Sequence, residues 1–136
     1  MEASPRWHRI LLVDDDLTDL FISRRVIELC RVARTIKATH RGAAALRHLQ
    51  NCAALSDYPS LILLDEKMPG LSGFAFLEAC RAGGYLPAGL TRVVLLTSSV
   101  DPFHWQQAAQ YGVHFLEKPL TRERLMACLA EGFEWE

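Results

Sequence analysis

Three short apolar runs, each followed at once by polar or charged residues, constrain the fold of this 136-residue chain more than any other feature. They cover residues 10–13, 61–64 and 93–96, and a fourth strand is expected over 113–116. A short, wholly apolar run indicates a strand that is buried on both faces, as in a parallel sheet. In open parallel sheets, ligands bind beyond the carboxyl ends of the strands. We therefore expect the polar residues after these runs to gather at one edge of one sheet.

Segments with helical periodicity alternate with these strands. A further strand is expected over 35–39, and helices are expected over 17–30, from 42, over 74–83, over 102–111 and from 121. Five β-α units in this order predict an α/β protein with a five-stranded parallel sheet and helices on both faces. Right-handed crossovers leave few topologies. The order 2-1-3-4-5, which we expect, would bring Asp14, Asp15 and Asp65 together at the switch point.

Local sequence signals predict how three of the helices begin and how the first one packs. Asp16, Asp101 and Thr121 are the expected N-caps, and Asp101 is followed by a proline at the first helical position. The helix over 17–30 is expected to turn an apolar stripe toward the core. This stripe consists of Leu20, Phe21, Val26, Ile27 and Cys30.

Composition excludes several classes of function. Half of the residues are hydrophobic and the net charge is −1, which argues against a nucleic-acid-binding surface. No apolar stretch approaches the ~20 residues needed to cross a membrane, and the first residues lack the apolar core of a signal peptide, so a cytoplasmic protein is expected. We expect one domain over 9–131, with short tails at 1–8 and 132–136 and no output domain.

The acids at the expected sheet edge indicate a cation site. Asp14, Asp15 and Asp65 would repel one another unless a cation or a proton lay among them. Oxygen ligands favour Mg²⁺ or Mn²⁺. The sequence has no glycine-rich phosphate loop, so a bound phosphate would depend on the metal, on the Lys118 ammonium and on hydroxyls such as that of Thr97. Such a set of groups suits phosphoryl transfer.

Four strings in the sequence resemble the receiver domain of two-component response regulators, and the resemblance covers about residues 8–131. The strings are LLVDDD, LLDEKMPG with Gly73, LLTSS and EKPL, and they occur in the family's order at the expected strand ends. The resemblance implies the flavodoxin-like (βα)5 fold. It also implies that an aspartate accepts phosphate, with Mg²⁺, from a sensor histidine kinase or a histidine phosphotransfer protein. The domain would catalyse only its own phosphorylation and dephosphorylation, and would not be an enzyme otherwise.

The resemblance gives a role to each matching residue. Asp14 and Asp15 fall on the family's metal-binding acidic pair, and Asp65 falls on the phosphoacceptor, which also binds the metal. Thr97 falls on the switch hydroxyl. Lys118 falls on the lysine that contacts the phosphoryl group.

Four further positions are assigned accessory roles. Phe115 falls on the switch aromatic, which is often Tyr, and without a hydroxyl its inward rotamer should cost less. Lys67 is expected to offer its backbone carbonyl to the metal, while its side chain overhangs the site and prolongs the life of the phosphoryl group. Ser98 is small and leaves the site open to a kinase or phosphatase. Pro119 follows the lysine and is often preceded by a cis peptide in the family.

Phe103 and Trp105 fall where family members usually have polar residues. Two aromatics on the face that responds to phosphorylation indicate a partner surface. One possible partner is a second copy of the chain. Such a homodimer would form through the helix over 102–111, the strand over 113–116 and the last helix. The alternative is that both rings fold back onto the protein.

Two other functions compete with the receiver interpretation. The spacing of Asp14, Asp16 and Thr18 also fits the nucleophile motif of haloacid-dehalogenase-like phosphohydrolases, with Asp14 as the nucleophile. The chain could also be an adaptor that keeps the receiver fold without being phosphorylated.

Overall fold

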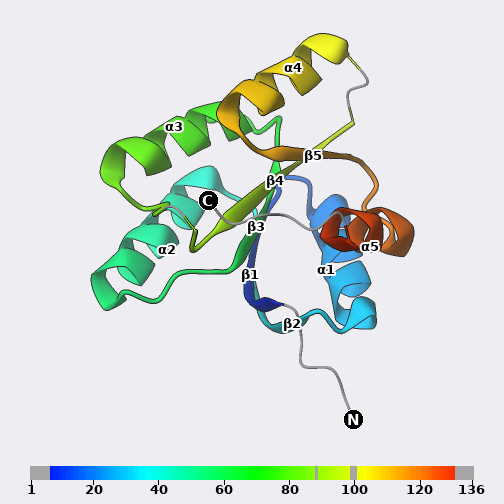
Figure 1. Ribbon diagram of the computed structural model, residues 1–136, viewed down its shortest axis with the longest axis horizontal. Helices are drawn as coiled ribbons and strands as arrows, with labels where there is room; N and C mark the ends of the chain where they lie inside the picture. The colour runs from blue at the N-terminus through cyan, green and yellow to red at the C-terminus, as the bar shows by residue number, and fades with distance from the viewer. Residues whose placement is uncertain (1–6, 88, 99–100, 131–136) are drawn as a thin grey trace.

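Strands and helices alternate along the chain in the computed structural model, which describes residues 7–87, 89–98 and 101–130 (Figure 1). The elements are β1 (Trp7–Val13), α1 (Leu17–Cys30), β2 (Ala33–Thr39), α2 (Gly42–Leu55), β3 (Leu61–Asp65), α3 (Gly73–Gly83), β4 (Arg92–Thr97), α4 (Pro102–Tyr111), β5 (His114–Glu117) and α5 (Arg122–Ala130). The strands form one parallel sheet in the order β2-β1-β3-β4-β5. The predicted fold class and strand order are confirmed.

Two apolar cores enclose the sheet, one on each face. Because side chains alternate along a strand, Ile10 and Leu12 of β1 enter the core beneath α1 and α5, whereas Leu11 and Val13 enter the core beneath α2, α3 and α4 (Figure 1). The central strand β3 is buried at every position. Burial on both faces explains why its sequence is a continuous apolar run.

The predicted caps place the helices at the carboxyl edge of the sheet. The Asp16 carboxylate accepts hydrogen bonds from the backbone N–H groups of Thr18, at 2.9 Å, and Asp19, at 3.1 Å. Asp101 caps α4 and Thr121 caps α5 in the same way. These caps satisfy backbone donors that have no partner within the helix. All three N-cap predictions are confirmed.

The predicted inward stripe of α1 is wrong at Phe21, which is 66% exposed. Ile27 is buried, and Leu20, Val26 and Cys30 pack against the same core. Ile27 lies seven residues after Leu20 and therefore almost above it, whereas Phe21 is rotated by about 100° around the helix. The side chain of Phe21 therefore points to solvent.

No helix in the described ranges combines the length and the apolar character that crossing a bilayer requires.

Candidate functional site

Three carboxylates meet at the carboxyl ends of β1 and β3. These strands are paired in parallel, and Val13 of β1 lies opposite Leu64 of β3. Asp14 and Asp15 directly follow β1, and Asp65 is the last residue of β3. Asp14 and Asp65 are buried, Asp15 is half-buried, and one oxygen of each lies within 4.8 Å of the others. The structure thus brings together the three acids singled out in the sequence.

Lys118 reaches this cluster from the segment between β5 and α5. Its Nζ lies 2.8 Å from Asp14 Oδ2 and 3.3 Å from Asp65 Oδ1. Its backbone N–H donates a 2.7 Å hydrogen bond to the carbonyl of Thr97, which ties this segment to the end of β4. The Lys118–Pro119 peptide bond is cis. The hydrogen bond to Thr97 and the charges of the acids together hold the ammonium beside the cluster.

Asp19 is a fourth carboxylate of the site, and the sequence interpretation missed it. It lies in the first turn of α1, and its Oδ2 is 2.9 Å from Lys118 Nζ. The helix dipole favours an acid in the first turn of any helix, so an acid at this position does not by itself indicate a functional site. The available signal was its place in the first turn of the helix that begins just after Asp14 and Asp15, because that turn lies at the same edge of the sheet.

The pKa values of the clustered groups reflect burial and crowding. Burial, a hydrogen bond with Asp15 and the charge of Asp14 raise the pKa of Asp65 to about 8, although Lys118 acts in the opposite direction. Burial also raises the pKa of Asp14. For Lys118, burial lowers the pKa, but the close carboxylates of Asp14 and Asp19 outweigh it and leave the pKa above its ordinary value. One ammonium does not balance these acids, so the cluster takes up a proton or a further cation.

The donor set fits a hard divalent cation. Asp14 Oδ2 is buried and has an ion-pair contact with Lys118, but it has no hydrogen bond of good geometry. Among the described residues, Asp14, Asp15 and Asp65 are the cluster of His, Cys, Asp or Glu side chains whose atoms converge on one point. All three contribute oxygen, the ligand atom that Mg²⁺ and Mn²⁺ prefer. The backbone N–H of the exposed Lys67 donates to Asp65 Oδ1 at 3.3 Å, and the expected role of the Lys67 carbonyl stays a prediction.

The two predicted switch residues, Thr97 and Phe115, lie on the neighbouring strands β4 and β5. Thr97 ends β4, and its hydroxyl donates a 2.9 Å hydrogen bond to Glu66 Oε1. Ser98 follows it and is exposed. Phe115 of β5 lies opposite Leu95 and is half-buried against the core of α3 and α4. The sequence interpretation did not identify the buried Glu66 as a site residue. It lies between Asp65 and Lys67, and nothing in this local sequence indicates that its side chain pairs with Thr97.

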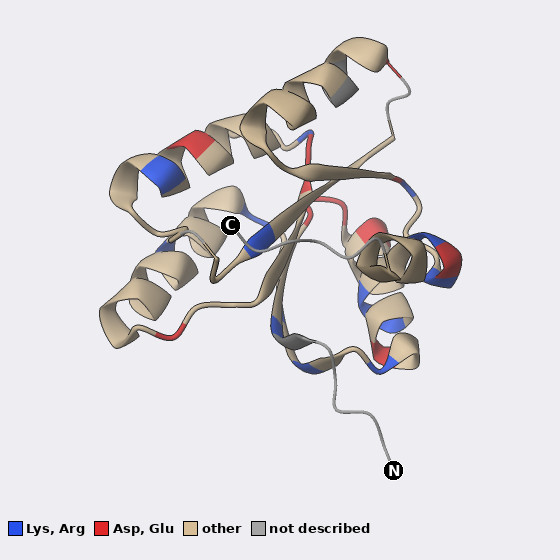
Figure 2. Ribbon diagram, in the orientation of Figure 1, with Lys and Arg blue, Asp and Glu red and all other residues tan. Residues whose placement is uncertain are grey.

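The expected partner residues lie on α4. Phe103 is 60% exposed, whereas the side chain of Trp105 lies outside the described part of the structure. The sequence of α4 contains no Asp, Glu, Lys or Arg, and its described part has no charged segment in Figure 2. An outward helix without charge is more typical of a contact surface than of a solvated one.

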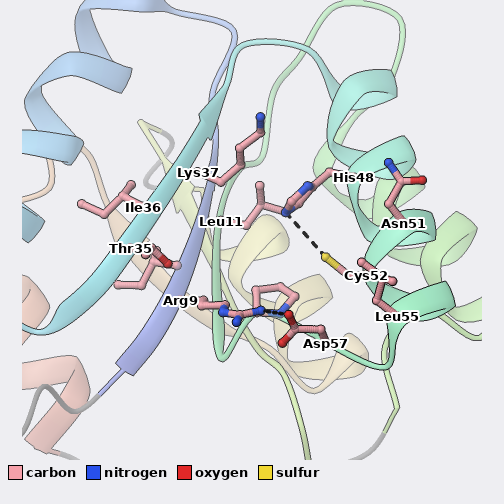
Figure 3. A pocket seen from close by; sticks show the side chains of 12 residues that line it. Arg9, Leu11, Thr35, Ile36, Lys37, His48, Asn51, Cys52, Leu55 and Asp57 are labelled. Atoms are coloured by element: carbon pink, nitrogen blue, oxygen red, sulfur yellow. Dashed lines mark hydrogen bonds and ion pairs between the residues drawn. The ribbon is translucent and has the colours of Figure 1, made fainter.

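A cavity of about 380 Å³ lies at the other end of β1, between β2 and α2 (Figure 3). His48 Nε2 and Cys52 Sγ are 3.6 Å apart in it, and Arg9 forms an ion pair with Asp57. Burial raises the pKa of Cys52 and lowers that of His48, so the thiol stays protonated and the imidazole stays neutral at neutral pH. The cavity is lined by the amino-terminal part of β1, so it is separate from the acidic cluster.

A parallel sheet of this order, with acids and a lysine at its switch point, defines a CheY-like receiver of the flavodoxin-like class. The chain belongs to the response regulator receiver domain family, whose family model matches residues 10–130.

Solved structures share this fold over nearly the whole chain. A two-component response regulator from Cytophaga hutchinsonii has a TM-score of 0.85 and 27% identity, with 93% of this chain and 96% of that chain covered. A bacteriophytochrome response regulator has a TM-score of 0.79 and 30% identity, with 95% of this chain and 80% of that chain covered. A two-component response regulator of Arabidopsis thaliana is 29% identical over 126 residues, which are 92% of this chain and 21% of that protein. The chain spans half or less of the length of the first curated relatives it matches.

Proposed function

We propose that this chain is a phosphoacceptor receiver in a two-component phosphorelay and that Asp65 takes the phosphoryl group. One observation carries the proposal: Asp65, at the tip of the central strand, lies within 4.8 Å of two other acids and 3.3 Å from the Lys118 ammonium. A nucleophilic carboxylate beside a cation site and a fixed ammonium is the arrangement that phosphoryl transfer requires.

The donor is a phosphohistidine of a sensor histidine kinase or a histidine phosphotransfer protein. An oxygen of Asp65 attacks the phosphorus, the P–O bond forms as the P–N bond breaks, and the imidazole leaves and takes a proton from water. Asp14, Asp15 and Asp65, with the backbone carbonyl of Lys67, would hold Mg²⁺, which when bound neutralises charge on the phosphoryl oxygens. Lys118 supplies a second positive charge, 3.3 Å from Asp65 Oδ1.

The signal leaves through the surface formed by β4, α4, β5 and α5. The phosphoryl group adds nearly two negative charges beside Thr97, whose hydroxyl turns toward it, and Phe115 moves inward into the space that is vacated. The uncharged α4, with Phe103 exposed and Trp105 two residues later, then contacts a protein partner or a second copy. Sedimentation at high concentration, with and without phosphorylation, tests the dimer, which a monomeric profile in both states would exclude.

Incubation with acetyl phosphate and Mg²⁺, followed by intact mass measurement, tests the proposal. Wild type should gain one phosphoryl group, and Asp65→Asn should gain none. Phosphate retained on Asp14 would instead indicate the haloacid-dehalogenase-like hydrolase, and no phosphorylation of wild type would indicate the adaptor. Phosphotransfer assays from candidate histidine kinases to wild type and to Asp65→Asn would then identify the donor.

A further inference from the structure

Glu66 is a buried acid at the functional site for which the proposed function has no role. It is 6% exposed, although glutamate is rarely buried without a specific partner. Its Oε1 accepts a 2.9 Å hydrogen bond from the hydroxyl of Thr97, which is 1% exposed. A hydrogen bond to a carboxylate is stronger than one between neutral groups, and burial shields it from competition with water.

The backbones of both residues are held in place, so this contact does not depend on flexible segments. The N–H of Glu66 donates to the carbonyl of Leu96 at 2.9 Å, and the Glu66 carbonyl accepts from Gly73 N–H at 2.8 Å. Gly73 packs so closely that an added Cβ would lie 3.0 Å from Glu66 Cα. The carbonyl of Thr97 accepts the 2.7 Å hydrogen bond from Lys118. Only the two side chains are left to rearrange.

A threonine hydroxyl has a single proton to donate, and a carboxylate can only accept. In the resting protein, that proton is directed to Glu66. A phosphoryl group on Asp65 would need the same proton from Thr97. The two acceptors therefore compete for one donor.

We propose that Glu66 is a positioning residue that latches Thr97 in its resting orientation and so opposes the switched state of the receiver. This inference rests on the proposed function, since it assumes that Thr97 responds to a phosphoryl group on Asp65. The carboxylate stabilises one of two hydroxyl orientations, and loss of that acceptor shifts the population toward the other. Glu66 thereby sets how much free energy the phosphoryl group must contribute before the switched state predominates.

The test measures binding of beryllofluoride, a non-covalent analogue of the phosphoryl group, at fixed Mg²⁺ by fluorine NMR. Glu66→Met removes the acceptor at similar volume, whereas Glu66→Gln removes the charge and keeps an acceptor oxygen. Glu66→Met should lower the dissociation constant of beryllofluoride about tenfold, and Glu66→Gln should lower it less. In a Thr97→Val background, where no hydroxyl can be released, Glu66→Met should change it by less than about twofold.

Several results would overturn the latch. One is an unchanged or raised dissociation constant of beryllofluoride in Glu66→Met. Another is a tenfold lower dissociation constant for Glu66→Met in the Thr97→Val background as well. Either result would mean that Glu66 does not act through the Thr97 hydroxyl. Wild type that binds no beryllofluoride would overturn the proposed function itself, so the two failures are distinguishable. If Glu66→Met does not fold, the wild-type protein provides a second test. The Thr97 hydroxyl proton should exchange slowly enough to be seen by proton NMR without beryllofluoride, and its signal should shift when beryllofluoride binds. Absence of this hydroxyl signal would contradict the latch.

Discussion

The ammonium of Lys118 lies 2.9 Å from the carboxylate of Asp19, although 99 positions separate the two residues. The same ammonium contacts Asp14 and Asp65. One cation thus links the first turn of α1 to the tips of β1 and β3. Its loss would leave three acids, two of them buried, without their shared partner.

Replacement of Lys118 with Met should therefore destabilise the metal-free protein by about 3 kcal/mol, because removal of one partner leaves buried charge uncompensated. Urea unfolding measures this change in the free energy of unfolding. Mg²⁺ should restore part of the loss, since it can take over the neutralisation of the acids. Lys37→Met, at an exposed position of β2, is the matched control and should change stability little. Equal effects of the two substitutions would contradict the role of the ion-pair cluster.

The raised pKa of Asp65 predicts a pH-dependent stability. Its value of about 8 in the folded protein lies far above that of an aspartate in an unfolded chain. The folded state holds this proton more tightly, so the contribution of Asp65 to stability is complete at low pH and declines as the pH rises from about 4 to about 8. Lys118 does not change this window, because its raised pKa matters only at more alkaline pH.

Thermal melts without metal should accordingly show a melting temperature that falls between about pH 5 and pH 8. Because Mg²⁺ competes with the proton for Asp65, its stabilising effect should be larger at the higher pH. Asp65→Asn should reduce both dependences. A stabilisation by Mg²⁺ that does not vary with pH in this range would count against proton binding at Asp65.

Gly73→Ala should disturb the site through its backbone. An added Cβ would lie 2.9 Å from the carbonyl oxygen of Asp65 and 3.1 Å from Leu95 Cδ2. The strand or α3 must shift, which should cost about 1–3 kcal/mol and weaken Mg²⁺ binding. Gly112→Ala is the control: it has a φ of +70° but nothing within 4 Å of its added Cβ, so it should lower stability without changing Mg²⁺ affinity. Unchanged metal affinity in Gly73→Ala would contradict the prediction.

Lys67→Ala should shorten the lifetime of the phosphorylated protein severalfold. The residue lies two positions after Asp65, its side chain is exposed, and we predict that this side chain obstructs the hydrolytic water. Loss of phosphate after removal of excess acetyl phosphate measures the lifetime. Lys67→Met keeps most of the bulk and should preserve the long lifetime if obstruction is steric. A lifetime that stays flat in Lys67→Ala would exclude the idea.

The sequence by itself determined the alternation of strands and helices, the two buried faces of the central strand and the position of the acids at strand ends. These features follow from local patterns, because apolar runs, caps and the handedness of β-α-β crossovers act within neighbouring segments. Asp14, Asp15 and Asp65 could be expected to meet for this reason alone.

Only the tertiary structure decided that Asp19 pairs with Lys118, that Thr97 donates to Glu66 and that Phe21 faces solvent. Thr97 and Glu66 are 31 positions apart, and neither residue type indicates its partner. Such contacts depend on how α1, β3, β4 and the segment after β5 pack together. The physical reason is that side-chain orientation and burial are set by packing between distant elements, and a local pattern does not contain that information.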